Sequence, residues 1–192
     1  MKKLYLLGDS IRKGYEPLVK EKLSGRAEVF SPGEINGEFA QYTLRHLHDW
    51  AEKNDCAKEI DIVHWNNGLW DIVRHFGDDC LTPPDMYANM LRRIYKRITV
   101  IFPRAKVIFA LSTPVIEERF TEPAKFFRFN KDIREYNNIA SNVMKELKIE
   151  VNDLYSVASD FSVDQYADMV HFTQEGYDIL AEAVVKACEP YL

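Results

Sequence analysis

Short apolar runs alternate with amphipathic helical patterns along the chain, and this alternation restricts the possible folds more than any other feature. The runs have the length and composition of buried strands, and the segments between them carry apolar residues at helical spacing. Parallel strands joined by helices form a sheet that is covered on both faces. We therefore predict a three-layer α/β/α sandwich around a parallel sheet of about five strands. The expected strands are 4–7, 27–30, 60–65, 107–111 and 149–154, and the clearest helices are 37–53, 85–98 and 174–187.

Length and charge narrow the class of protein. A chain of 192 residues can bury roughly 70% of its unfolded surface around one core, so we expect one domain over residues 1–192. The net charge of -5 argues against binding to nucleic acid, which usually requires a basic face. No apolar run approaches the roughly 20 residues of a membrane span, so no membrane partner is expected. The sequence leaves the oligomeric state open.

The amino terminus and the cysteines indicate a compartment. Two lysines precede an apolar stretch, as in a signal peptide, but Leu4–Leu7 is too short to be the apolar core of one. Cys56, Cys80 and Cys188 are odd in number and widely spaced, so they predict neither a disulfide framework nor a zinc site. We expect a protein of the reducing cytoplasm.

A serine lies directly after the first expected strand, where Leu4–Leu7 runs into Gly8-Asp9-Ser10 and a helical pattern begins at once. A serine at such a turn is exposed at the carboxyl edge of a parallel sheet, next to the positive end of a helix dipole. Both features favour the negative charge that develops when a serine attacks a carbonyl. Asp9 is expected to be a structural partner of the turn. The alternative is that Asp9 or Ser10 only caps the helix.

An acid and a histidine lie three residues apart near the other end of the chain, as Asp168 and His171. An acid at this spacing can accept the Nδ1 proton of the imidazole, which leaves Nε2 free to take a proton from a serine hydroxyl. Such pairs are common in surface turns. The pair indicates a catalytic site only in combination with the serine turn Gly8-Asp9-Ser10 after the first expected strand.

Together these two segments resemble the first and last sequence blocks of the SGNH (GDSL-like) hydrolase family, and the resemblance covers nearly the whole chain. It implies a flavodoxin-like fold in which Ser10 is the nucleophile, His171 the general base and Asp168 the acid that orients it. It also implies an oxyanion hole formed by the backbone N–H groups of Ser10 and a glycine, with an asparagine side chain. Gly37, which lies directly before a helix, is the expected glycine, and Gly33 is the second choice.

The third block departs from the usual pattern of the family, in which a buried strand ends in Gly-x-Asn-Asp. Here the strand runs into the segment 66–71, and Trp70 takes the register of the asparagine. The resulting Asn-x-Gly-x-Trp-Asp arrangement is similar to a variant found in some branches of the superfamily, including relatives of polysaccharide O-acetyl esterases. We expect Asn66 to supply the side-chain donor, with Asn67 as second choice. Alternatively, each is a turn asparagine that bonds its own backbone.

The resemblance implies a serine esterase that forms an acyl-enzyme and needs no metal or other cofactor. The expected substrate is a small O-acyl ester, above all an acetyl ester, of a carbohydrate or similar polar alcohol, because the chain has no long lid-like apolar insertion. Trp70, Asn67 and Thr113 are expected to contact it. Transfer of the acyl group to an alcohol would look the same in sequence. The alternative function is a catalytically silent α/β module that binds an acylated or sugar ligand, which the substitution by Trp70 favours.

Overall fold

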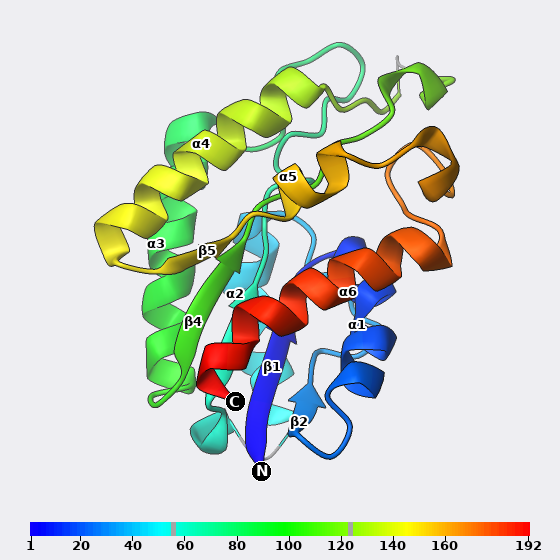
Figure 1. Ribbon diagram of the computed structural model, residues 1–192. Coiled ribbons are helices and arrows are strands. Elements are labelled where there is room, and N and C mark those ends of the chain that lie inside the picture. Colours follow the sequence, from blue (N-terminus) through cyan, green and yellow to red (C-terminus); the bar gives the residue numbers. More distant parts are fainter. Residues whose placement is uncertain (55–56, 123–124) are drawn as a thin grey trace.

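Five parallel strands form one sheet in the computed structural model, which describes residues 1–54, 57–122 and 125–192 (Figure 1). The spatial order of the strands is β2-β1-β3-β4-β5, and each neighbouring pair is parallel. The strands are β1 (Lys2–Leu7), β2 (Ala27–Phe30), β3 (Ile62–Trp65), β4 (Lys106–Ala110) and β5 (Glu150–Asn152). The predicted α/β sandwich with a five-stranded parallel sheet is confirmed.

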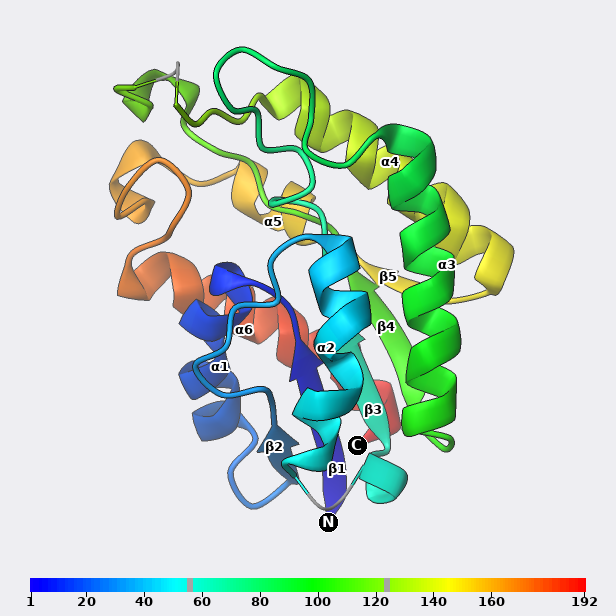
Figure 2. The ribbon, with the colours of Figure 1, turned by 180° about the vertical axis from the view of Figure 1, so that it is seen from behind.

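Helices cover both faces of this sheet, as expected for strands that are apolar on both sides. Helices α1 and α6 pack together on the face nearer the viewer in Figure 1, and α2 and α3 pack together on the opposite face, seen in Figure 2. Helix α4 packs against α3. The helices are α1 (Ser10–Lys22), α2 (Ala40–Glu52), α3 (Pro84–Ile101), α4 (Asn130–Leu147), α5 (Leu154–Ser159) and α6 (Gln174–Cys188).

Several element boundaries differ from the sequence prediction by a few residues, and two of these differences have local reasons. The last strand ends at Asn152, because the Asp153 side chain accepts a hydrogen bond from the Ser156 N–H at 2.9 Å and so begins the short helix α5. Helix α2 begins at Ala40 and not around Gly37. The N–H group of Ala40, which has no acceptor within the helix, donates to the buried carboxylate of Asp71.

The register of the sheet brings distant segments to one edge. Leu7 at the end of β1 pairs with Trp65 at the end of β3, so the turns that carry Ser10 and Asn66 leave the sheet side by side. The arrowheads in Figure 1 point to this upper edge, where the loops after β4 and β5 also lie. Open parallel sheets bind ligands at this edge.

Among the described helices, none has both the length and the apolar character that crossing a bilayer requires. Cys80 and Cys188 are free thiols. Cys56 lies outside the described residues.

Candidate active site

The turn between β1 and α1 places a serine at a helix N-terminus. Helix α1 begins at Ser10, and Asp9 is its N-cap, whose Oδ1 accepts a hydrogen bond from the Ile11 N–H at 2.9 Å. Asp9 is buried, and this burial raises the pKa of its carboxyl. Asp9 therefore stabilises the turn, and the Ser10 side chain extends from the first helical position at the edge of the sheet.

Ser10 lies in a continuous line of hydrogen bonds with two residues from the other end of the chain. Its Oγ is 2.8 Å from Nε2 of His171, and Nδ1 of His171 is 2.7 Å from Oδ2 of Asp168. The structure thus brings together the three residues that the sequence singles out for nucleophilic catalysis.

The backbone fixes the acid of this line. Oδ1 of Asp168 accepts hydrogen bonds from the N–H groups of Val170 and His171, both at 2.7 Å. Partial burial alone would raise the pKa of Asp168, but these N–H donors and the imidazole outweigh burial, so its pKa lies below the usual value. An ionised Asp168 holds the proton of His171 on Nδ1 and leaves Nε2 free to accept.

Arg119 holds the loop that carries Asp168 and His171. Its Nη1 donates to the carbonyl oxygens of Tyr166 at 3.1 Å and Asp168 at 3.0 Å, and its Nη2 donates to that of Val163 at 3.2 Å. These carbonyls lie more than forty residues away in the chain. No local sequence pattern signals the contact, and sequence reasoning missed this role.

Gly37 lies against the turn before Ser10, but its N–H is not free. The N–H donates to the carbonyl oxygen of Gly8 at 3.0 Å, which corrects the expectation of an open oxyanion donor at this position. A Cβ on Gly37 would lie 2.7 Å from the same oxygen, so the close backbone approach requires glycine. Gly33, the second choice, is exposed in a turn with φ of 67°.

Asn66 follows β3 and faces the sheet edge beside the serine turn. Its side chain is 7% exposed, and its Nδ2 donates to the carbonyl oxygen of Ala110 at 3.0 Å. That bond uses one of the two amide hydrogens. The other amide hydrogen donates to no described residue.

Asn67 points to the other side of the strand end and does not reach the site. Its Nδ2 donates to the Glu38 carbonyl oxygen and to Oγ1 of Thr43, both at 3.0 Å, and its Oδ1 accepts from the Trp65 indole at 2.7 Å. The side chain is fully buried. The expectation that Asn67 contacts substrate or supplies the oxyanion donor is therefore wrong, because both amide hydrogens are committed inside the protein.

The two other residues expected to bind substrate differ in position. Thr113 is only 1% exposed and lines an internal cavity of about 10 Å³, so the expected substrate contact is wrong. Trp70 is half-buried and packs edge-on against Phe126, with ring centroids 6.4 Å apart. Its ring lies among the loops at the carboxyl edge of the sheet.

Arg128 is a buried cation that sequence reasoning missed. The side chain is 3% exposed, its Nε donates to the Leu69 carbonyl oxygen at 2.5 Å, and its guanidinium lies over the rings of Phe126 at 4.5 Å and Trp70 at 5.3 Å. Burial lowers the pKa of Arg128 to about 10, so the group stays charged at neutral pH. In the sequence, Arg128 is simply an arginine within an aromatic stretch, and nothing in that pattern predicts its burial.

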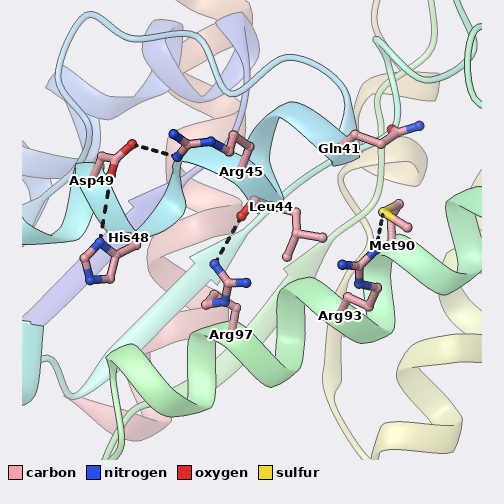
Figure 3. A pocket seen from close by; sticks show the side chains of 8 residues that line it. All are labelled: Gln41, Leu44, Arg45, His48, Asp49, Met90, Arg93 and Arg97. Carbon is pink, nitrogen blue, oxygen red and sulfur yellow. Dashed lines mark hydrogen bonds and ion pairs between the residues drawn. The ribbon is translucent and has the colours of Figure 1, made fainter.

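A separate groove lies between α2 and α3, away from the serine turn. Figure 3 shows three arginines, His48 and Asp49 around the apolar side chains of Leu44 and Met90, in a cavity of about 560 Å³. None of Ser10, His171 and Asp168 lines it. The groove therefore does not hold the candidate catalytic residues.

Comparison with known proteins agrees with this geometry. The model of the GDSL-like lipase/acylhydrolase family matches residues 6–179. The chain belongs to this family. It is therefore a serine ester hydrolase. No curated protein matches the sequence.

Solved structures of this GDSL-like hydrolase's relatives share its fold at low sequence identity. A lipase/acylhydrolase from Enterococcus faecalis is 22% identical with a TM-score of 0.78, and the match covers 99% of this chain and 96% of that one. An acetyl xylan esterase is 20% identical with a TM-score of 0.72, over 96% and 98% of the two chains. A GDSL-like lipase from Bacteroides thetaiotaomicron is 19% identical with a TM-score of 0.75, over 100% and 89%.

Proposed function

We propose that this hydrolase removes small acyl groups, above all acetyl, from esters of a carbohydrate or similar polar alcohol through a triad of Ser10, His171 and Asp168. The observation that carries the proposal is the line of hydrogen bonds at 2.8 Å and 2.7 Å that joins these side chains at the N-terminus of α1. A serine hydroxyl is a weak nucleophile until a base takes its proton. Here an oriented imidazole nitrogen lies at the distance which that transfer needs.

The reaction has two halves. Oγ of Ser10 bonds to the carbonyl carbon while its proton passes to Nε2 of His171, and the alcohol then leaves with that proton as the C–O bond breaks. Water next attacks the acyl-enzyme and gives a proton to His171. The carboxylic acid departs, and Ser10 regains its proton. Asp168 stays ionised and stabilises the imidazolium in both halves.

Two donors are suited to hold the oxyanion. Ser10 is the first residue of α1, so its N–H has no acceptor within the helix. The second amide hydrogen of Asn66 lies outside the bond to Ala110. Each such donor contributes about 3–4 kcal/mol in the transition state. Gly37 fits less well, because its N–H already donates to Gly8.

The choice of substrate is supported by one side chain and one relative. The half-buried ring of Trp70 gives the sheet edge an aromatic surface of the kind that packs on apolar faces of a ligand. One structure with this fold is an acetyl xylan esterase. We place the activity in the cytoplasm, on the ground that Cys80 and Cys188 are free thiols.

Hydrolysis of p-nitrophenyl acetate, butyrate and octanoate by wild type, Ser10→Ala and Ser24→Ala tests the proposal. Ser24 is an exposed turn serine and is the matched control. We expect the acetate to be the best substrate and Ser10→Ala to lose about 10⁴- to 10⁶-fold in kcat, with Ser24→Ala unchanged. Equal activity of wild type and Ser10→Ala would refute the triad, and a preference for octanoate would refute the small acyl group.

A further inference from the structure

Two arginines are buried near the serine turn, and their surroundings differ. Nη1 and Nη2 of Arg12 are satisfied by an ion pair with Glu16 and by the carbonyl oxygens of Gly33 at 2.9 Å and Ile35 at 2.5 Å. Arg12 therefore fastens the loop before Gly37 to α1. It is a structural cation with its own anion.

Arg128 has no such anion. Within the described residues, its guanidinium makes no ion pair, and its one side-chain hydrogen bond runs from Nε to the Leu69 carbonyl oxygen. Nη1 and Nη2 donate to no described residue. The phenyl ring of Phe126 and the indole of Trp70 hold the group in place from the side.

Neither of the two carboxylates that influence Arg128 forms an ion pair with it in the described part of the chain. Asp9 and Asp168 both raise its pKa through space. The guanidinium is held by the carbonyl oxygen of Leu69, a residue that lines one small cavity with Ile11 and Asn66 beside the serine turn. Oδ1 of Asp9 accepts from the Ile11 N–H, whereas its buried Oδ2 has no hydrogen-bond partner among the described residues. Both oxygens of Asp168 accept from the His171 loop. Neither carboxylate lies within ion-pair distance of Arg128 in the part of the chain that is described.

A buried cation without a hydrogen-bonded anion is costly, and a neutral side chain of similar volume would fill the space at lower free energy. The guanidinium also presents parallel N–H donors that match the two oxygens of a carboxylate. The free donors and the catalytic line of Ser10 and His171 belong to the same edge of the sheet.

We infer that Arg128 is an anion-binding subsite of the active centre, and that the preferred ester carries a carboxylate on its acyl or its alcohol part. This inference rests on the proposed esterase function and specifies its substrate class. The ester carboxylate takes the place of the missing ion-pair partner, while its carbonyl carbon lies at Oγ of Ser10.

Two matched pairs of esters test the subsite and separate the two positions of the charge. For the alcohol part, 3-carboxyphenyl acetate is compared with 3-carbamoylphenyl acetate. For the acyl part, mono-p-nitrophenyl succinate is compared with p-nitrophenyl succinamate, after subtraction of the uncatalysed rates. We expect wild type to prefer the charged member of one pair by about 10- to 100-fold in kcat/KM, as a charge-assisted contact gives.

The variants attribute the preference to one side chain. Arg128→Gln is expected to abolish the preference, because kcat/KM for the charged ester falls to that for its neutral partner, and Arg128→Lys to keep part of the preference. Arg93→Gln removes the same charge from the distant groove of Figure 3 and should leave the preference intact. The inference is overturned if wild type prefers neither charged ester, whether or not the Arg128 variants fold, or if Arg128→Gln keeps the preference.

A binding measurement distinguishes failure of this inference from failure of the proposed function. Calorimetric titration of Ser10→Ala needs no catalysis and uses the amide analogues of both charged esters, 3-acetamidobenzoate and N-(4-nitrophenyl)succinamate, each beside its uncharged carboxamide. We expect one of the two carboxylates to bind and neither carboxamide, and we expect this binding to vanish in Ser10→Ala with Arg128→Gln. Binding without ester hydrolysis by wild type would refute the esterase and support the subsite. Hydrolysis of neutral esters by wild type without binding of either carboxylate would support the esterase and refute the subsite.

Discussion

Asp71 gives a prediction whose size follows from the structure. The residue is fully buried, and both of its carboxylate oxygens accept from the Ala40 N–H at the start of α2, at 3.1 and 3.2 Å. Burial raises the pKa of Asp71 to about 7, in spite of hydrogen bonds from Ala40 and the Thr82 hydroxyl that lower it. The folded protein therefore binds a proton at Asp71 where the unfolded chain, with a pKa of 3.8, does not.

The sign and size of the effect follow from proton linkage. A carboxyl whose pKa is raised on folding destabilises the folded state as pH rises above its unfolded pKa, and the effect levels off above the folded pKa. With values of 3.8 and about 7, Asp71 lowers the free energy of unfolding by about 2 kcal/mol at about pH 5 and about 4 kcal/mol at about pH 8. Between these two pH values the free energy of unfolding falls by about 2–3 kcal/mol.

The assay is urea unfolding of wild type and Asp71→Asn at both pH values. Asparagine keeps an oxygen for Ala40 and can donate its amide to Thr82, so its packing cost is the same at each pH. We expect the variant to gain about 2–3 kcal/mol in free energy of unfolding relative to wild type between about pH 5 and about pH 8, or about 5–10 °C in Tm. A difference between the two proteins that does not change with pH would refute a protonated Asp71.

Three further substitutions test how the site is built. Asp168→Asn should lower kcat on p-nitrophenyl acetate about 10⁴-fold, because the imidazole of His171 loses the acceptor that fixes its tautomer; a loss below about tenfold would exclude Asp168 as the triad acid. Gly37→Ala should lower the free energy of unfolding by about 1–3 kcal/mol and lower kcat as well, because the added Cβ meets the Gly8 carbonyl oxygen and displaces the serine turn. An unchanged kcat would show that the serine turn tolerates this displacement. Arg119→Gln should speed amide hydrogen exchange over residues 163–171 and lower the free energy of unfolding by about 1–2 kcal/mol, because three loop carbonyls lose their donor. Unchanged exchange would show that the loop is ordered without Arg119.

The fold could be predicted because its signals are local. Apolar runs that become buried strands and apolar residues at helical spacing depend on only a few neighbouring residues. The same holds for Ser10, at a strand-to-helix turn, and for Asp168 and His171, whose spacing lets the side chains meet within one loop. The observed element boundaries differ from the predicted ones where a single capping side chain, such as Asp153, decides where a helix begins.

The remaining site residues depend on packing that no local pattern encodes. Asn66 and Asn67 are adjacent in the chain, yet Asn66 faces the serine turn, whereas Asn67 is buried against α2, where it donates to Thr43. Thr113 follows a strand as expected but turns into the interior. Arg128 meets the Leu69 carbonyl fifty-nine residues away, a contact that only the assembled fold creates.

Covalent labelling tests the central claim most directly. Ethyl p-nitrophenyl methylphosphonate transfers its phosphonyl group to an activated serine and releases p-nitrophenol. We predict one equivalent of p-nitrophenol, with the label mapped by mass spectrometry to Ser10, and labelling slower by on the order of 10³-fold or more in His171→Ala. A label on another residue, or His171→Ala labelled as fast as wild type, would contradict the account.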